Sequence, residues 1–314
     1  MNTQRTTLDA VSHNSVLARH SPQRRLGVIL GAVAVMLALS TLILVPKVQA
    51  DEINVDDGAV AEDDTDGQCS LIEAIHAANT DSSHADCDAG NNDDTIILAA
   101  GSTYTLTGAY DGSYNGLPII TSTIAIEGHG ATIRRDPTSG DFRILQVGDG
   151  GGYAGNLTLR DVTIAGGRIA GGRIHDRGGG IYNLESTLTV TNNTIISNNT
   201  SSSLGGGIYN YDGALTIANS TIISNTSTDN GGGGVWNAQG SLSIHNSTII
   251  SNTASEEGGG VSNAGTLTIT DSTVSGNTAD NDDGGGVYNS DDSTLTIANS
   301  TVSGNAASSY GGGM

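Results

Sequence analysis

The segment GGGIYNYDGALTIANSTIISN, residues 205–225, recurs with small changes through the second half of the chain and decides the fold. It holds three blocks: a triple glycine followed by two residues and Asn, a Leu-Thr-Ile triplet, and an Asn-Ser-Thr-Ile block that ends in Asn. Triple glycines begin at 178, 205, 232, 258, 284 and 311, so the steps are 27, 27, 26, 26 and 27 residues. Self-similarity at a fixed period predicts stacked units that bury their apolar faces against one another.

The spacing of the blocks identifies the unit. The gaps between blocks vary in length, whereas nothing is inserted within a block. Length variation marks loops, so the blocks are expected to be strands. Each block is short and alternating: Leu215 and Ile217 point to one side, and Thr216 points to the other. Three short strands in one period predict one coil of a parallel β-helix, which is an all-β solenoid.

Such a coil predicts columns of like residues. Leucines at equivalent positions should stack in the interior, about 4.8 Å apart; they are Leu188, Leu215, Leu242, Leu267 and Leu295. The closing asparagines should stack at a turn, with amides bonded from coil to coil; they are Asn198, Asn225, Asn252, Asn277 and Asn305. The alternative for a chain rich in Gly, Ser and Asn is disorder, but disorder does not keep apolar residues in register.

Before residue 178 the repeat weakens without vanishing. LTLRDVTIAGG, residues 157–167, matches the second and third blocks, with Asp161 in place of an asparagine. Four further segments are predicted to be strands of irregular early coils: 95–98, 103–107, 117–126 and 142–147. We therefore expect one domain from about residue 51 to the end, with about eight coils at the spacing of paired strands.

The amino terminus predicts export. Leu26 to Val45 is a run of twenty residues without a charge, preceded by Arg24 and Arg25 and followed by small residues up to Ala50. This pattern predicts a signal peptide cleaved after Ala50, with an uncleaved signal anchor as the alternative. The positive charges precede the apolar run, so either interpretation places the rest of the chain outside the cytoplasm.

Two cysteines enclose a helical segment. Cys69 and Cys87 are the only cysteines of the chain, and in an oxidising compartment we expect a disulfide between them. The segment CSLIEAIHAANTD, residues 69–81, has apolar residues at helical spacing, and Ser70 with Glu73 forms a capping box. The helix, held by the disulfide, is expected to cover the exposed edge of the first coil.

This segment also carries a family resemblance. CSLIEAIHAAN resembles the Cys-Ser-Leu-Arg-Glu-Ala motif that opens certain bacterial exported β-helix proteins, with Ile72 in place of Arg. The triple-glycine and Asn-Ser-Thr-Ile repeats are similar to those of polymorphic outer-membrane-protein-like surface proteins. The resemblance implies a right-handed parallel β-helix with a surface or secreted role and no established activity. Related chains often end in an anchoring domain; this sequence stops at Met314 inside a repeat, so a truncated product is expected.

The predicted organisation has four parts. They are a signal peptide or signal anchor at 1–50, a cap with the helix at 51–94, irregular early coils at 95–177, and regular repeats at 178–314.

Charge restricts the partners. Residues 51–314 contain 32 acidic and 7 basic side chains, a net charge of −25, and no Lys or Arg follows Arg177. Nucleic acid and anionic membrane surfaces are therefore excluded, and the only membrane contact expected is the N-terminal segment if it stays uncleaved. Glycans or surface proteins are the candidate partners, and no oligomeric state is predicted. One Gly-rich loop contains three arginines, Arg168, Arg173 and Arg177. They form either an anion-binding site or a solvent-exposed group that neutralises the charge of nearby Asp residues.

Metal and cofactor signals are weak. Glu62, Asp64, Asp66 and Glu73 fall at positions 1, 3, 5 and 12 of a calcium-loop pattern, with Gly67 at position 6. Position 1 is Glu instead of Asp, and the capping box already accounts for Glu73. These residues are calcium candidates only, and neither a resident metal nor a cofactor is predicted.

Catalytic motifs are absent from the sequence: it has no His-Glu-x-x-His and no Gly-x-Ser-x-Gly. The chain is therefore predicted to be a non-enzymatic, exported β-helix with a structural or adhesive role at the cell surface or outside the cell. The alternative is a carbohydrate-active β-helix enzyme, a polysaccharide lyase or hydrolase with its site in the early coils.

An aromatic column is the last candidate site. The residue before Asn in each GGGxxN block should point outward, which gives Tyr182, Tyr209, Trp236, Ser262 and Tyr288. Rings at strand spacing would form a flat strip able to bind sugar rings. The alternative, which we favour because Ser262 interrupts the column, is that the rings only shield the sheet.

Overall fold

A computed structural model describes residues 51–63, 65–171 and 176–314. The signal segment, its cleavage residue Ala50, the calcium candidate Asp64 and the loop arginine Arg173 lie outside the described residues. No helix within the described ranges is long and apolar enough to cross a membrane.

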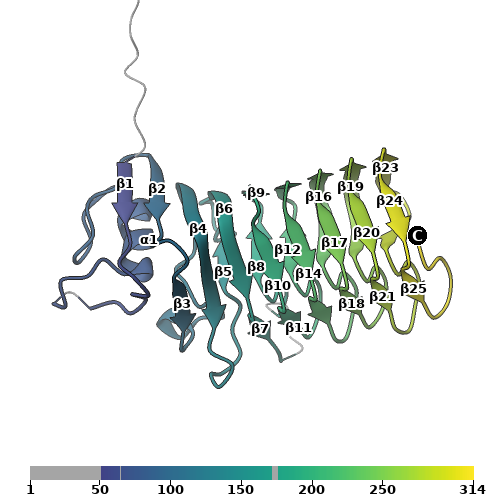
Figure 1. The fold of residues 1–314 in the computed structure, drawn as a ribbon, viewed down its shortest axis with the longest axis horizontal. Helices are drawn as coiled ribbons and strands as arrows, with labels where there is room; N and C mark the ends of the chain where they lie inside the picture. The colour runs from purple at the N-terminus through teal and green to yellow at the C-terminus, as the bar shows by residue number, and fades with distance from the viewer. Residues whose placement is uncertain (1–50, 64, 172–175) are drawn as a thin grey trace, which may run out of the picture. The chain divides into compact units, whose positions relative to one another are not determined.

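The described chain is a right-handed parallel β-helix of about eight turns (Figure 1). The strands before the regular repeats are β1 (Asp51–Asn54), β2 (Asp93–Ile97), β3 (Thr103–Leu106), β4 (Thr123–Arg135), β5 (Leu145–Val147), β6 (Asn156–Ala165) and β7 (Arg168–Ile169). Two helical elements accompany them, the α-helix α1 (Leu71–Thr80) and the short 3-10 helix η1 (Tyr110–Gly112). Predicted strands 95–98, 103–107 and 142–147 overlap β2, β3 and β5, and the predicted strand 117–126 overlaps the start of β4.

The regular repeats supply the remaining strands. Those of the GGGxxN blocks and the Leu-Thr-Ile triplets are β8 (Ile181–Leu184), β9 (Thr187–Thr191), β12 (Ile208–Tyr211), β13 (Ala214–Ala218), β16 (Val235–His245), β19 (Val261–Thr270), β22 (Val287–Asn289) and β23 (Thr294–Ala298). Those of the third block are β10 (Ile195–Ser197), β14 (Thr221–Ile223), β17 (Thr248–Ile250), β20 (Thr273–Ser275) and β24 (Thr301–Ser303). Together with β7, five two-residue strands of the repeats form a second sheet: β11 (Thr200–Ser201), β15 (Thr226–Ser227), β18 (Thr253–Ala254), β21 (Thr278–Ala279) and β25 (Ala306–Ala307).

The predicted leucine column is confirmed. Parallel pairing places Leu188 beside Leu215, and the same register continues through Leu242 and Leu267 to Leu295. All but the last of these leucines are fully buried, and Leu295 is partly buried. In the opposite direction the column continues through Leu157 and Ile124 and meets the buried carboxylate of Asp94.

The asparagine ladder exists, with one correction to its membership. Each side-chain amide donates to the oxygen of the next at 3.0 Å, and the ladder runs from Asn199 through Asn225, Asn252 and Asn277 to Asn305. Asn198 was the predicted first member, but its backbone is left-handed at φ 52° and its neighbour Asn199 occupies the ladder position. The sequence carries two adjacent asparagines there, and the strand pairing selects the second.

A second asparagine ladder was not predicted. It is built from the Asn of the GGGxxN blocks, with amide-to-oxygen distances of 2.6 to 2.7 Å. Its members are Asn183, Asn210, Asn237, Asn263 and Asn289. The first four are completely buried, and Asn210, Asn237 and Asn263 each accept one ladder bond and donate the next, which satisfies polar groups that water cannot reach.

The triple glycine has a steric cause. Gly205 has φ +67°, a conformation that L side chains rarely adopt. A Cβ on Gly206 would come within 2.4 Å of the Thr226 carbonyl oxygen, and one on Gly207 within 2.6 Å of the Gly234 oxygen. Neighbouring coils therefore approach backbone to backbone at this edge, which excludes any larger residue.

The helix α1 forms as predicted and packs across the first strands. The Ser70 hydroxyl accepts from the backbone N–H of Glu73 at 3.3 Å, and the Glu73 carboxylate accepts from the N–H of Ser70 at 2.9 Å. Its apolar residues join the main core, and the helix contacts β1, β2 and β4. The Cys69–Cys87 disulfide joins its start to the loop that follows it.

The first strand, β1, is an element that the sequence analysis did not assign. It pairs in parallel with β2, and no other described strand pairs with it. The predicted position of α1 over the outer edge of the first coil is therefore only partly right, because the helix lies across three consecutive strands. The exposed carboxylates of Asp51 and Glu52 stand on β1 itself, and charge on an end strand disfavours pairing with another chain.

Candidate functional site

The aromatic column is in register, but it is not a flat exposed strip. Tyr182 pairs with Tyr209, and Tyr209 pairs with Trp236. Tyr182 is only 8% exposed and Tyr209 only 2% exposed, and their rings are 5.2 Å apart with a 59° tilt. These two rings lie outside the main core, as predicted for outward side chains, but neighbouring side chains cover them, so the expected exposure is wrong. They form a small apolar cluster outside the main core, packed with Leu184, Leu204, Tyr211, Ala238 and Trp236.

Two arginines fix this cluster in place. The guanidinium carbon of Arg143 lies 5.1 Å from the Tyr182 ring centre, and that of Arg177 lies 5.0 Å from the Tyr209 ring centre. Arg177 also donates a hydrogen bond of 2.8 Å to the Tyr209 hydroxyl. Burial lowers the pKa of Arg143 to about 10 and raises the pKa of Tyr209 to about 12. At pH 7 Arg143 is therefore still charged and Tyr209 is neutral. The cation–π contacts persist at this pH and stabilise the cluster. Ser262 is buried, Trp236 and Tyr288 are half-buried, and a ligand role for the column stays a prediction.

The arginines of the predicted anion site have separate partners. Arg168 forms an ion pair of 3.1 Å with Asp141, while Arg177 bonds to Tyr209 as described. Arg160, on β6, pairs with Glu127 on the neighbouring strand β4. The two described loop arginines therefore do not converge on a common anion, and Arg173 lies outside the described residues.

The calcium candidates do not share a site either. Both oxygens of Glu73 are used inside the cap, one by Ser70 and one by the backbone N–H of Asp63 at 2.8 Å. Asp66 accepts from the backbone of Gln68 at 2.8 Å, and Asp64 is not among the described residues. Glu62 turns to His84 instead, at 2.9 Å.

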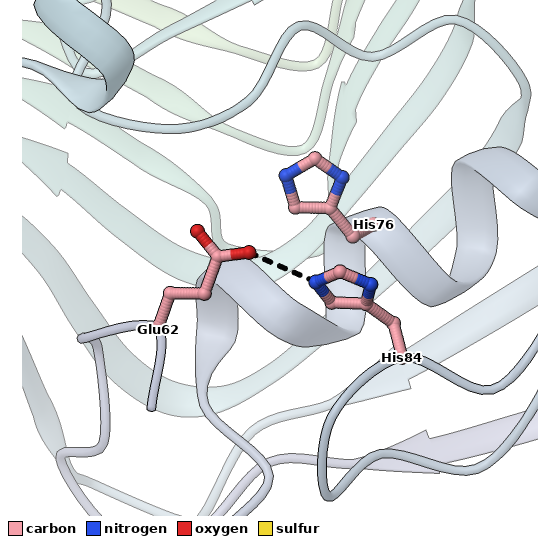
Figure 2. Close-up of side chains that lie close together, drawn as sticks. All are labelled: Glu62, His76 and His84. Atoms are coloured by element: carbon pink, nitrogen blue, oxygen red, sulfur yellow. Dashed lines mark hydrogen bonds and ion pairs between the residues drawn. The ribbon is translucent and has the colours of Figure 1, made fainter. Parts of the chain in front are cut away.

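Glu62 belongs to a cluster that the sequence analysis did not single out. It comes from the segment before α1, His76 comes from α1 and His84 from the loop that follows it (Figure 2). One ligand atom from each residue lies within 4.8 Å of the other two. The imidazole rings lie one above the other with centres 4.7 Å apart, and the Glu62 carboxylate is beside them (Figure 2).

A tyrosine and a groove border this cluster. Nε2 of His76 is 2.6 Å from the hydroxyl of Tyr110, in η1. Glu62 and Tyr110 both line a groove of about 650 Å³, together with Val60, Ile72 and Leu106. The pKa of His76 is lowered mainly by burial and further by the neighbouring His84, while Glu62 acts in the opposite direction. The only sequence signal for the cluster was that both histidines lie between the two cysteines.

The outer face of the regular coils carries a different kind of array. Outward residues of β9, β13, β16, β19 and β23 line up in two rows across the strands. We call these rows the hydroxyl face; its members are Thr187, Thr189, Thr216, Ser241, Ser243, Thr266, Thr268, Thr294 and Thr296. Ala214 is the one position of the two rows without a hydroxyl. One row is exposed and the other is half-buried except at Thr296, which is exposed.

The comparisons with known proteins agree with this fold. A family model described as a right handed beta helix region matches residues 173–313. No curated protein and no solved structure matches the chain.

Proposed function

We propose that this chain is an exported β-helix repeat protein with a structural and adhesive role at the cell surface or outside the cell, and without catalytic activity. The observation that carries the proposal is the hydroxyl face. It presents rows of Thr and Ser in register across five strands, on a rigid sheet held by two internal asparagine ladders.

The chemistry of this face suits a neutral, polar polymer such as a glycan. A hydroxyl both donates and accepts hydrogen bonds, and equivalent hydroxyls recur at the strand spacing of about 4.8 Å. Each contact is weak, but contacts along one rigid surface act together and raise the overall affinity. The net charge of −25 on residues 51–314 works against nucleic acid and anionic lipid. Surface glycans and neutral regions of surface proteins are therefore the partners that we propose.

Two observations support export. The apolar segment from Leu26 to Val45 follows a cluster of arginines, as in secretory signals. The cap contains the Cys69–Cys87 disulfide, a bond that persists in oxidising compartments.

A glycan array probed with the full chain tests the adhesive part. The variant T216V/S243A/T268V removes three hydroxyls from the hydroxyl face with almost no change in shape. Its control, T226V/T253V/T278V, removes three hydroxyls from the second sheet. We expect the first variant to lose at least about tenfold in binding, as expected when several parallel contacts are removed, and the control to bind normally. Equal binding by both variants and the wild-type protein would refute adhesion through this face.

Two further measurements test the rest of the proposal. Cell fractionation with surface proteolysis should place the chain outside the cytoplasm, and recovery in the cytoplasm would contradict export. Incubation with acidic and neutral polysaccharides should release no reducing ends and no unsaturated sugars. Depolymerisation that a substitution in residues 95–177 abolishes would replace the adhesive proposal with a carbohydrate-active enzyme.

A further inference from the structure

We propose that Glu62, His76 and His84 form a binding site for a divalent transition metal of the Zn²⁺ class, and that the metal clamps the N-terminal cap. The site is independent of the adhesive function proposed above, since it lies in the cap and shares no residue with the hydroxyl face.

The donor set determines the class of metal. Two imidazoles and one carboxylate suit Zn²⁺ and its neighbours, whereas Ca²⁺ prefers sets made entirely of oxygen. Zinc–ligand distances of about 2.0–2.2 Å place tetrahedral ligand atoms roughly 3.4 Å apart. The three ligand atoms already lie within 4.8 Å of one another, and His84 and Glu62 are 2.9 Å apart. The remaining gap therefore involves His76, and small rotations of the three side chains, none of which is fully buried, would close it.

The backbones of all three ligand residues are anchored before any metal binds. His76 lies within α1, whose start is fixed by the capping box. His84 and Cys87 exchange backbone hydrogen bonds of 3.3 and 3.0 Å, so the disulfide turn holds His84 in place. Glu62 precedes Asp63, whose N–H donates to Glu73 of the helix. Such preorganisation distinguishes a built site from side chains that meet by chance on a surface.

The neighbouring tyrosine completes the arrangement. The Tyr110 hydroxyl lies at hydrogen-bond distance from His76, as do the outer groups that orient imidazole ligands at metal sites. The open groove beside Glu62 and Tyr110 gives the ion an entry path and room for a water ligand. The metal would join three segments: the one before α1, the helix itself and the loop after it. The disulfide links only the start of the helix to that loop.

Zinc titration of the full chain, purified without a polyhistidine tag, tests the site. We expect one equivalent to bind with a Kd of about 1 µM or tighter, and the melting temperature to rise with added zinc and fall back with chelator. H84A and H76A should each weaken this binding at least about 100-fold, and Y110F should weaken it about tenfold. The matched control H245A removes an exposed histidine of the regular coils and should leave the affinity unchanged.

Cobalt substitution supplies an independent readout. Co²⁺ in a four-coordinate site gives strong visible bands, which should appear with wild-type protein and H245A and be lost with H84A. E62Q changes an exposed side chain and tests the site if a histidine variant does not fold. The absence of saturable zinc binding by the wild-type chain would overturn the proposal. So would an affinity that E62Q and H84A leave unchanged, since zinc would then bind elsewhere.

Discussion

The N-terminal part, residues 51–177, and the regular coils, residues 178–314, share one coil design but place their chemistry differently. In the regular coils the same residue recurs on every turn, so its partners are copies of itself: Leu on Leu and Asn on Asn. In the N-terminal part the period is broken, and unlike groups meet. All seven arginines after residue 50 and the described histidine–carboxylate cluster lie there.

This difference shows what repetition excludes. A charged side chain repeated on every coil would meet its own charge about 4.8 Å above and below, which is unfavourable. Neutral amides and hydroxyls can stack on themselves because each is both donor and acceptor. The arginines after residue 50 are accordingly all found where the repeat is irregular, and the acidic residues of the regular coils do not recur as a column on every coil.

The largest effect should come from a charge in the leucine column. Leu242→Asp places a carboxylate between Leu215 and Leu267 and should cost about 5 kcal/mol or more of unfolding free energy. Ser243→Asp, one residue further on the outward face, should cost less than about 1 kcal/mol. Denaturant melts of the two variants compare them directly, and similar losses would contradict the observed register.

Breaking an amide ladder should cost somewhat less. Asn252→Ala removes the acceptor of Asn225 and the donor to Asn277, both buried, and should destabilise by about 3–4 kcal/mol. Asn281→Ala, at an exposed position of the regular coils with an ordinary backbone conformation, should change stability by less than about 1 kcal/mol. Thermal unfolding followed by circular dichroism measures both, and a mild effect of Asn252→Ala would mean that water replaces the ladder.

The disulfide should matter about as much, but only in the N-terminal part. Replacing Cys69 and Cys87 by Ser removes an 18-residue closure, worth about 3 kcal/mol. Because coils contact only their neighbours, the loss should be confined to the cap and first coils. Hydrogen exchange should show faster opening of β1 and α1 with protection of β17 and β20 unchanged. Uniform loss of protection would show that the whole solenoid unfolds as one unit.

The smallest effect concerns Asp94, at the end of the apolar column. Its pKa is raised, chiefly by burial and further by Asp81, Asp51 and Asp93, although the Asn91 N–H opposes the shift. A raised pKa means that the fold favours the protonated form, so stability is lost as pH rises from the ordinary value of about 4 through the raised one. Asp94→Asn removes this loss. Its melting temperature relative to wild type should therefore be higher at pH 7 than at pH 3.5, and a pH-independent difference would contradict the raised pKa.

For the regular repeats, the fold could be predicted from the sequence alone. Strand positions and the leucine register followed from period and alternation, since five copies report on the same position. Where one copy differs, the pattern became ambiguous: two adjacent asparagines, Asn198 and Asn199, made the ladder member undecidable until strand pairing was known. The burial of Tyr182 and Tyr209 was missed because the covering groups, such as Leu204 and Arg177, come from variable loops and the preceding coil.

The cluster of Glu62, His76 and His84 could not be predicted from the sequence, for a related reason. Glu62, His76 and His84 meet because a disulfide turn folds back on a helix and a hydrogen bond holds the segment before it. Each of these contacts occurs only once, so no repeated pattern in the sequence indicates it. Residue spacing alone suggested a calcium loop that would combine Glu62 with Glu73. In the structure both carboxylate oxygens of Glu73 accept backbone hydrogen bonds within the cap instead.

The self-pairing of the asparagine ladders makes each regular coil an exchangeable part. Every coil offers the same amide oxygens on one side and the same amide donors on the other, so a coil cannot distinguish its neighbour from the next one along. If residues 232–257 were removed, Asn210 would face Asn263 and Leu215 would face Leu267, with every ladder bond re-formed. Length can therefore change in whole coils through gain or loss of one repeat in the gene, each step altering the reach of the protein by about 4.8 Å.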